Sequence, residues 1–245
     1  MNEFVLTETA NAFEVTCGID SLEHCKDVAH YKTYSKSVIY SYNSFGYRDE
    51  EWPQDLIDSI WCVGDSFTVG LGQPHDETWV KLVEKKTGKR TINVSMNGAS
   101  NDWIAKRVQS IIDNFSPSVI LIQWSYVHRR ENKDDAMATD EARRIHFIKA
   151  EGGREKFADI QALDKKNCIE NILKIKRQPT TQIVHSFIPK FARTDDAEFI
   201  YNELTKHDVN FFPEQPQVDF ARDSHHYDIQ TASNYTNLYV SNLKI

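Results

Sequence analysis

The chain has 245 residues, a formal net charge of -7 at pH 7 and 40% hydrophobic residues. This length is typical of one large α/β domain, and the hydrophobic fraction is sufficient for an extensive buried core. The acidic balance argues against nucleic-acid binding, because nucleic-acid-binding proteins neutralise phosphates with a basic face. The main basic cluster, 85–90, is predicted to be a solvated helix end.

No apolar run reaches the ~20 residues that a membrane-spanning helix needs. The first residues, Met1–Phe4, lack the positive charge and the long apolar stretch of a signal peptide. The sequence therefore predicts a cytoplasmic protein and leaves release by another route open. Four cysteines without a CxxC spacing are predicted to be buried thiols: Cys17, Cys25, Cys62 and Cys168.

Residues 1–55 do not alternate regularly between strand and helix patterns, and they are rich in Tyr, Ser and Asn. We predict that they form an N-terminal extension of loops and short strands, packed on a domain that spans 56–245. From Ser59 onward, short apolar runs alternate with helical patterns. This alternation is typical of a parallel sheet covered by helices.

In the first half of the domain the apolar runs predict strands at Ile60–Val63, Thr91–Ser95 and Val119–Ile122. A helix over Thr78–Lys86 is predicted between the first two strands. Between the second and third, apolar residues recur at i, i+4, i+7, i+8 and i+11 from Ile104, which is the spacing of one helix face.

The second half begins with a long charged stretch, 134–175, which predicts two helices separated by Gly152-Gly153. Such a large insertion between core strands is predicted to form a lid or side wall. The remaining predicted elements are a strand at Ile183–Ile188, a helix at Asp195–Lys206, a short strand at Val209–Phe212 and a C-terminal helix within Asp228–Leu243. Together the elements predict a three-layer α/β/α sandwich of flavodoxin-like type, with a parallel sheet of about five strands.

Ser66 follows the first apolar strand and Gly64, so its side chain is predicted to emerge at the carboxyl edge of the sheet, where open α/β sheets bind ligands. A serine hydroxyl becomes a strong nucleophile when a base removes its proton and a third group orients that base. Near the end of the chain, Asp223 and His226 have the spacing to supply both groups. His225 is the alternative base, but the Asp-x-x-His spacing favours His226.

Several segments together are similar to the signature blocks of one family. They are Gly64–Gly70 (GDSFTVG), Asn93–Gly98 (NVSMNG) and Asp223–His226 (DSHH). The earlier segment Asn43–Arg48 (NSFGYR) resembles a stretch that often precedes the first strand in the same family. The chain from about 43 to 243 resembles the SGNH/GDSL hydrolases. The resemblance implies hydrolysis of a carboxylic ester, such as an O-acetyl carbohydrate or a lipid-type ester. It implies a small-molecule or glycan substrate and requires neither a cofactor nor a metal.

By position, the resemblance implies that Ser66 is the nucleophile, that His226 is the general base and that Asp223 orients it. Ser66 and Gly98 would donate their backbone N–H groups to the oxyanion hole. The chain departs from the family after the third strand of the domain. There the residues 123–130 (QWSYVHRR) replace the Gly-x-Asn-Asp block, whose Asn supplies a further oxyanion donor.

Ser125 is the nearest predicted replacement for that donor, and Gln123 is the second. Asn97 or Asn101, which flank the second block, could also reach the oxyanion hole. The predicted substrate contacts near the same edge are Trp124, Asn97, Asn101 and Arg129. Core packing is the competing prediction for Trp124, and a salt-bridged surface turn is the competing prediction for Arg129.

Two other functions stay open on this sequence. An O-acyltransferase would use the same triad and pass the acyl group to a sugar hydroxyl. A binding or structural protein could keep the fold and lack activity, and the absent Asn favours that alternative.

No cluster of His, Cys, Asp or Glu has the spacing of metal ligands. The oligomeric state and the natural ester are not specified by the sequence.

Overall fold

The computed structural model of the protein describes residues 13–14, 19–131, 154–175 and 179–244. At its centre is a four-stranded parallel sheet in the order β4-β3-β5-β6. The strands are β3 (Ile60–Gly64), β4 (Thr91–Ser95), β5 (Val119–Trp124) and β6 (Gln182–Phe187). Every residue of β3, β4 and β5 is buried, as expected for strands that helices cover on both faces.

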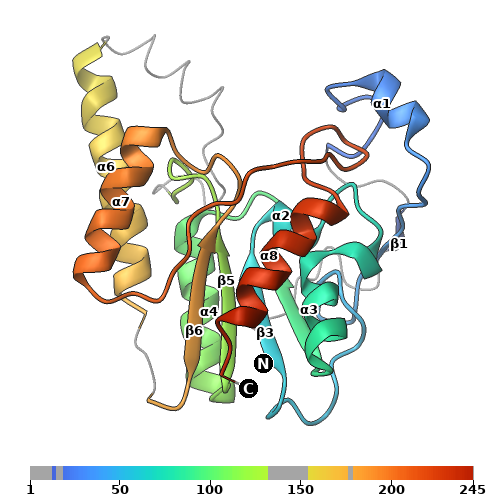
Figure 1. Ribbon diagram of the computed structural model, residues 1–245, viewed down its shortest axis with the longest axis horizontal. Helices are drawn as coiled ribbons and strands as arrows, with labels where there is room; N and C mark the ends of the chain where they lie inside the picture. The colour runs from blue at the N-terminus through green and yellow to red at the C-terminus, as the bar shows by residue number, and fades with distance from the viewer. Residues whose placement is uncertain (1–12, 15–18, 132–153, 176–178, 245) are drawn as a thin grey trace.

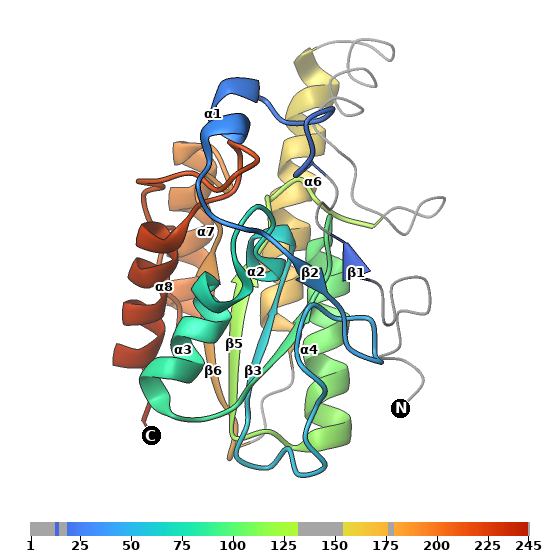
Figure 2. The same ribbon diagram turned by 90° about the vertical axis from the view of Figure 1, so that its right-hand side faces the viewer.

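Helices on both faces of the sheet make the three predicted layers (Figures 1 and 2). On one face, α3 (Trp79–Thr87) packs against α8 (Ile229–Ser241). On the other face lies α4 (Asn101–Phe115). Beside the β6 edge, α6 (Arg154–Leu173) packs against α7 (Thr194–Lys206). The predicted α/β/α fold is confirmed. Among the described residues, no helix is long and apolar enough to span a membrane.

The amphipathic pattern that begins at Ile104 lies on α4. This helix is capped by Ser100, whose Oγ accepts the Trp103 N–H at 3.1 Å. Such a cap typically contributes about 1 kcal/mol. Ile104 and Val108 are fully buried, so the apolar face of the helix points into the core. The helix ends at Ser116, which adopts the left-handed conformation with φ 46°.

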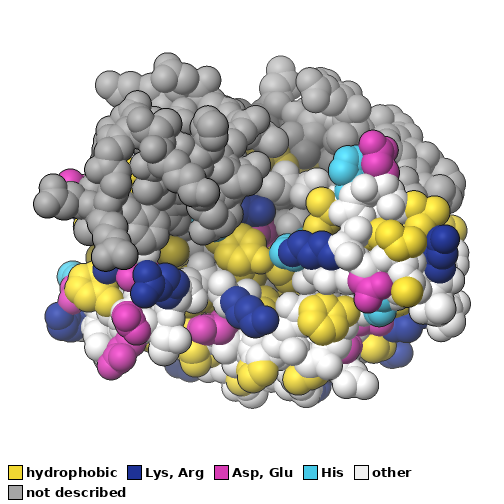
Figure 3. Space-filling model, turned by 90° about the horizontal axis from the view of Figure 1, so that it is seen from above, with side chains coloured by type: hydrophobic (Ala, Val, Ile, Leu, Met, Phe, Trp, Pro, Cys, Tyr) yellow, Lys and Arg dark blue, Asp and Glu magenta, His cyan; other side chains and the backbone are white. Residues whose placement is uncertain are grey.

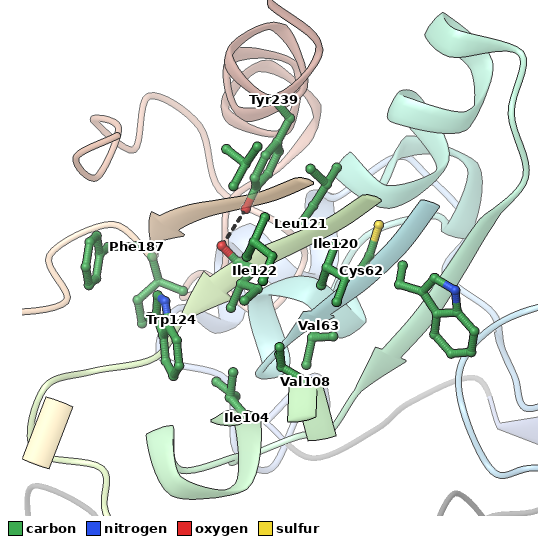
Figure 4. Packing of buried hydrophobic residues seen from close by; sticks show 14 of the residues in the cluster. Cys62, Val63, Ile104, Val108, Ile120, Leu121, Ile122, Trp124, Phe187 and Tyr239 are labelled. Atoms are coloured by element: carbon green, nitrogen blue, oxygen red, sulfur yellow. Dashed lines mark hydrogen bonds between the residues drawn. The ribbon is translucent and has the colours of Figure 1, made fainter. Parts of the chain in front are cut away.

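The core connects the central strands to the helices of both layers (Figure 4). From α8, the Tyr239 hydroxyl donates to the Ile122 carbonyl at 3.1 Å. From α4, Ile104 and Val108 pack on the other side of the strands. The thiol of Cys62 lies in this core. Because both faces are anchored, the carboxyl ends of the strands are held in fixed relative positions.

The expectation of a fifth strand was wrong. Within Val209–Phe212, only an isolated parallel bridge forms, between His185 and Phe211. The His185 N–H donates to the Asn210 carbonyl at 3.0 Å. Pro213 follows directly, and because proline has no N–H it cannot extend the ladder.

Parts of the predicted extension and insertion lie outside the described residues. In the insertion, α6 begins immediately after Gly152-Gly153, whereas 134–153, with the first predicted helix, are not described. In the extension, β1 (Phe13–Glu14) pairs with β2 (Tyr40–Ser41) as the predicted short strands, and a short helix, α1 (Val28–Thr33), is additional. The boundary near residue 55 stays a prediction.

The structure describes three of the four cysteines. Cys62 and Cys168 are buried and free, as predicted, and Cys25 is free but only partly buried. Cys17 lies outside the described residues.

At the amino end of the sheet, Glu84 ties α3 to β4. Its carboxylate accepts the Thr91 N–H at 2.8 Å and the Thr91 hydroxyl at 2.9 Å, and it pairs with Lys81 at 2.7 Å. Burial alone would raise the pKa of Glu84, but these hydrogen bonds outweigh burial and lower it to about 2. A carboxyl with a depressed pKa stabilises the fold above its ordinary pKa and loses that contribution as the pH falls.

Glu84→Gln should therefore lower the free energy of unfolding by about 2–3 kcal/mol near neutral pH. The difference from wild type should shrink as the pH falls from about 4.5 toward 2, because the wild-type carboxylate is then protonated. Denaturant unfolding of both proteins near pH 7, 4 and 3 measures this difference. A difference that is constant over the range would show that the charge of Glu84 is not stabilising.

Candidate active site

Ser66 is the first residue of α2 (Ser66–Val69), directly after β3 and Asp65. The Asp65 side chain caps this short helix, since its Oδ1 accepts the Phe67 N–H at 3.0 Å. Asp65 therefore holds the loop that carries Ser66. The helix α2, which begins at Ser66, follows the carboxyl end of β3, at the upper end of the sheet in Figure 1.

Gly64 is the last residue of β3, and its backbone lies close to Thr68 and Gln123 where the strand turns into α2. A Cβ at this position would lie 2.0 Å from Thr68 Oγ1 and 2.9 Å from the Gln123 carbonyl oxygen. Both atoms are buried, so neither neighbour can move away. Glycine is therefore required before Asp65 for a steric reason.

His226 Nε2 lies 2.8 Å from Ser66 Oγ, and His226 Nδ1 lies 2.5 Å from Asp223 Oδ2. Because an ionised carboxylate can only accept, Nδ1 carries the proton and Nε2 accepts the Ser66 hydroxyl. Burial alone would raise the pKa of Asp223, but the charge of His226 and hydrogen bonds from the imidazole and two backbone N–H groups outweigh burial and lower it. Asp223 is thus ionised at neutral pH.

The loop 221–226 shapes the Asp-x-x-His pair. Asp223 Oδ1 accepts the backbone N–H groups of His225 and His226, each at 2.9 Å. Between them, Ser224 adopts the left-handed conformation with φ 58°, which turns the chain back toward Asp223. The Ala221 N–H closes the loop by donating to the His226 carbonyl at 2.8 Å.

His225 makes a different contact from His226. Its Nδ1 accepts from Lys26 Nζ at 3.0 Å. Burial, together with the positive charges of His226 and Lys26, lowers the pKa of His225 to about 3. Its ring stands at 88° to the His226 ring. His225 is therefore neutral at ordinary pH and is bonded away from Ser66.

The backbone N–H groups of two residues expected in the site donate to no protein acceptor among the described residues. They are the N–H groups of Ser66 and Gly98, the pair expected for the oxyanion hole. Gly98 has φ 75°, and a Cβ there would meet nothing within 4 Å, so the space beside it is open. The neighbouring Asn97 is exposed, and its side chain stays a candidate substrate contact.

Ser125 and Asn101 are fully buried and hydrogen-bonded within the protein, so the predictions of Ser125 as an oxyanion donor and of Asn101 as a substrate contact were wrong. Ser125 is fully buried, and its hydroxyl donates to Asp65 Oδ2 at 2.5 Å. The Ser125 N–H donates to Asn101 Oδ1 at 3.0 Å, and Asn101 Nδ2 donates to the Tyr126 carbonyl at 3.1 Å. The Ser125 hydroxyl is used inside the protein because the buried carboxylate of Asp65 needs hydrogen-bond donors. Both side chains hold the turn after β5 instead.

Trp124 and Gln123 also belong to the core. The Trp124 indole is fully buried in the core (Figure 4). Its Nε1 donates to His185 Nδ1 at 3.1 Å. The expected substrate contact by Trp124 was wrong, because a strand residue with no exposed surface cannot meet a ligand from solvent. Gln123 is buried as well, and its Oε1 accepts from Tyr227 at 3.0 Å and from Thr68 at 3.2 Å.

Arg129 lies at the edge of this site with its side chain 18% exposed. Its Nη1 is 3.3 Å from Asp65 Oδ2, and its guanidinium lies over the Tyr126 ring at 5.1 Å. The Tyr126 ring in turn stands edge-on to Phe67, next to Ser66. Arg129 is thus ion-paired but still partly accessible to solvent, and it stays a candidate substrate contact.

From above the sheet (Figure 3), a histidine side chain meets basic and hydrophobic side chains near the middle of the described surface. Nowhere in the part of the chain that the structure describes do three or more His, Cys, Asp or Glu side chains gather so that they could hold a metal ion. The chemistry that this arrangement supports is nucleophilic attack by Ser66.

Arg48 was not predicted as a site residue, but it holds the loop behind Ser66. Arg48 is buried, and its guanidinium donates to the carbonyls of Val69 at 3.1 Å, Gly70 at 2.5 Å and Gln73 at 2.8 Å. The only signal for it was the likeness of Asn43–Arg48 to a stretch that precedes the family's first strand.

Comparisons with known proteins agree with this architecture. TesA is similar with a TM-score of 0.51 and 16% identity, over 76% of this chain and 98% of that chain. A carbohydrate esterase family 2 enzyme with a carbohydrate-binding domain, from Corynascus thermopiles (Myceliophthora fergusii), has a TM-score of 0.51 and 12% identity, over 83% of this chain and 70% of that chain. No family model and no curated protein sequence matches. At these identities the likeness shows the fold alone: a parallel four-stranded sheet flanked by helices, which matches SGNH-hydrolase structures.

Proposed function

We propose that the chain is a serine esterase that cleaves carboxylic esters through Ser66, His226 and Asp223. The observation that carries the proposal is the unbroken chain of contacts from Ser66 Oγ to His226 Nε2 at 2.8 Å and from His226 Nδ1 to Asp223 Oδ2 at 2.5 Å. A nucleophile, a base within hydrogen-bond reach and a group that orients the base are the requirements for acyl transfer to serine.

In the first step, His226 Nε2 takes the Ser66 proton while Oγ attacks the ester carbonyl. The tetrahedral intermediate then collapses, and the protonated His226 gives its proton to the departing alcohol. Water attacks the acyl-Ser66 with the same base, and the carboxylic acid leaves. Asp223 stays ionised throughout and stabilises the transient imidazolium.

The charge on the carbonyl oxygen would be met by the N–H groups of Ser66 and Gly98. Each donor in such a site typically contributes about 10²–10³ in rate. Because the Ser125 hydroxyl is bonded to Asp65, we place no third donor there. The exposed Asn97 side chain, next to Gly98, is the nearest group that can still turn toward the oxygen.

Labelling by a fluorophosphonate and hydrolysis of chromogenic esters of increasing acyl length test this function. O-acetylated sugars belong in the same screen, because one enzyme of similar fold is a carbohydrate esterase. We expect both labelling and release of the free acid. Labelling with transfer of the acyl group to an added sugar, and no free acid, would identify an acyltransferase. A folded protein that neither labels nor turns over would disprove catalysis at Ser66.

A further inference from the structure

Asp20 is a buried carboxylate of the N-terminal extension, more than 40 residues before Ser66 and 200 residues before the loop 221–226. It binds Arg222 with two bonds, from Nε to Oδ1 at 2.9 Å and from Nη2 to Oδ2 at 2.6 Å. Burial alone would lower the pKa of Arg222, but the hydrogen bonds and charge of Asp20 raise it. Arg222 directly precedes Asp223, so this ion pair fixes the backbone that carries the triad carboxylate.

The same carboxylate reaches the loop that follows Ser66. Tyr40 donates its hydroxyl to Asp20 Oδ2 at 2.7 Å, and the Tyr40 oxygen accepts the Gly72 N–H at 2.8 Å. Tyr40 is fully buried, and the Arg48 guanidinium lies 4.3 Å from its ring centre. Asp20 thus contacts one triad loop through Arg222 and the other through Tyr40.

The two loops also meet each other at Gly72. The Gly72 carbonyl accepts the Arg222 N–H at 3.0 Å. A Cβ on Gly72 would lie 2.9 Å from Ala221 Cβ and 3.2 Å from Asp223 Cγ. With so little space, a small displacement of either loop changes the separation of Ser66 and His226.

Some other residues of the extension contact the loop 221–226 but not the loop that follows Ser66. His30 Nε2 donates to the Ala221 carbonyl at 2.8 Å, and the Ser224 hydroxyl donates to the Asp27 carbonyl at 3.3 Å. The loop before α8 lies beside α1 in both Figures 1 and 2. These contacts are more exposed than the Asp20 site, so we assign the main effect to Asp20.

We propose that Asp20 is a positioning residue, which clamps the Ser66 loop to the Asp223–His226 loop through Arg222 and Tyr40. The inference rests on the proposed function for its kinetic consequence, but the clamp itself is a property of the fold. Loss of the Asp20 charge removes the carboxylate that pairs with the Arg222 guanidinium, whose side chain is only 14% exposed, and the 221–226 loop then shifts to hydrate that charge more fully. Misplacement of reacting groups by about 1 Å can lower a rate by about 10²-fold.

Asp20→Asn should lower kcat by about 10- to 100-fold and change KM little, because it alters the Ser66–His226 geometry and not the substrate contacts. The rate of fluorophosphonate labelling should fall by a similar factor. Proton NMR should show the downfield His226 Nδ1–H resonance of wild type broadened or shifted in the variant. Tyr40→Phe, which keeps the Asp20–Arg222 pair, should give a smaller loss in the same direction.

Glu84→Gln is the matched control, because Glu84 also accepts several hydrogen bonds from charged and backbone groups but lies at the opposite end of the sheet. It should lower stability and leave kcat and the His226 resonance unchanged. The double variant Asp20→Asn with Arg222→Gln should be no slower than Asp20→Asn alone, because both act through one contact.

The positioning role of Asp20 is disproved if the folded Asp20→Asn variant retains the wild-type kcat and His226 resonance. It is also disproved if Glu84→Gln lowers kcat as much as Asp20→Asn does. Failure of the proposed function has a separate signature. Wild type would then neither label nor hydrolyse esters, while the His226 resonance would still report whether Asp20 positions the loop.

Discussion

Ser66→Ala should abolish covalent labelling and lower the rate of ester hydrolysis by a factor on the order of 10⁴–10⁶. The alanine variant has no oxygen to attack the carbonyl, and the backbone donors of Ser66 and Gly98 can then only polarise the ester. Ser66 is 5% exposed, and within the part of the chain that the structure describes its hydroxyl makes one hydrogen bond, to His226. The substitution should therefore change the free energy of unfolding by about 1 kcal/mol or less.

Ser59→Ala supplies the matched control for this prediction. Ser59 is also buried, at 3% exposure, but it immediately precedes β3 at the opposite end of the strand from Ser66. It should label and hydrolyse like wild type. Mass spectrometry of the labelled protein would locate the adduct. An adduct on another residue, or undiminished hydrolysis by folded Ser66→Ala, would show that Ser66 is not the nucleophile.

The central sheet could be predicted because its signal is local. The strands β3 and β5 contain continuous apolar runs of four residues, and β4 alternates polar and apolar residues over five positions. The helix α4 has both a 3.6-residue apolar period and a cap at Ser100. The segment Val209–Phe212 has apolar residues but not the pairing length, since Pro213 ends it after one bridge.

The candidate site also contains residues whose role could be predicted from the sequence and residues whose role could not. Ser66, Asp223 and His226 have short-range signals, namely a serine after a strand and a fixed Asp-x-x-His spacing, and the structure brings them within bonding distance. The orientation of Ser125 depends on Asp65, which is 60 residues away. No local pattern reports that a buried carboxylate will use this hydroxyl, so the sequence could not exclude Ser125 as an oxyanion donor.

Asp20, Tyr40 and Arg222 show why the N-terminal extension could not be interpreted from its composition. Its polar residues predicted loops laid over the domain, whereas the ion pair of Asp20 with Arg222 spans 202 positions. Buried polar contacts of this kind are set by tertiary packing, not by propensity or period. The extension is therefore tied to the candidate site by specific buried contacts.

His226→Gln should lower kcat by about 10⁴-fold or more, because no other described group lies in place to take the Ser66 proton. The residual rate should rise with hydroxide concentration, since solvent must then remove that proton. Initial rates on one ester between about pH 6 and 9 measure both effects. Fluorophosphonate labelling should slow in parallel, because it also requires an activated Ser66.

His225→Gln is the informative partner of this variant, since it changes the same residue type one position away. His225 accepts from Lys26, and its pKa of about 3 keeps it neutral, so its loss should change kcat by only a few-fold. The backbone N–H groups of both histidines still hold Asp223 in either variant. If His225→Gln were the slower enzyme, the base would be His225, and the ring orientations described above would have to exchange during turnover.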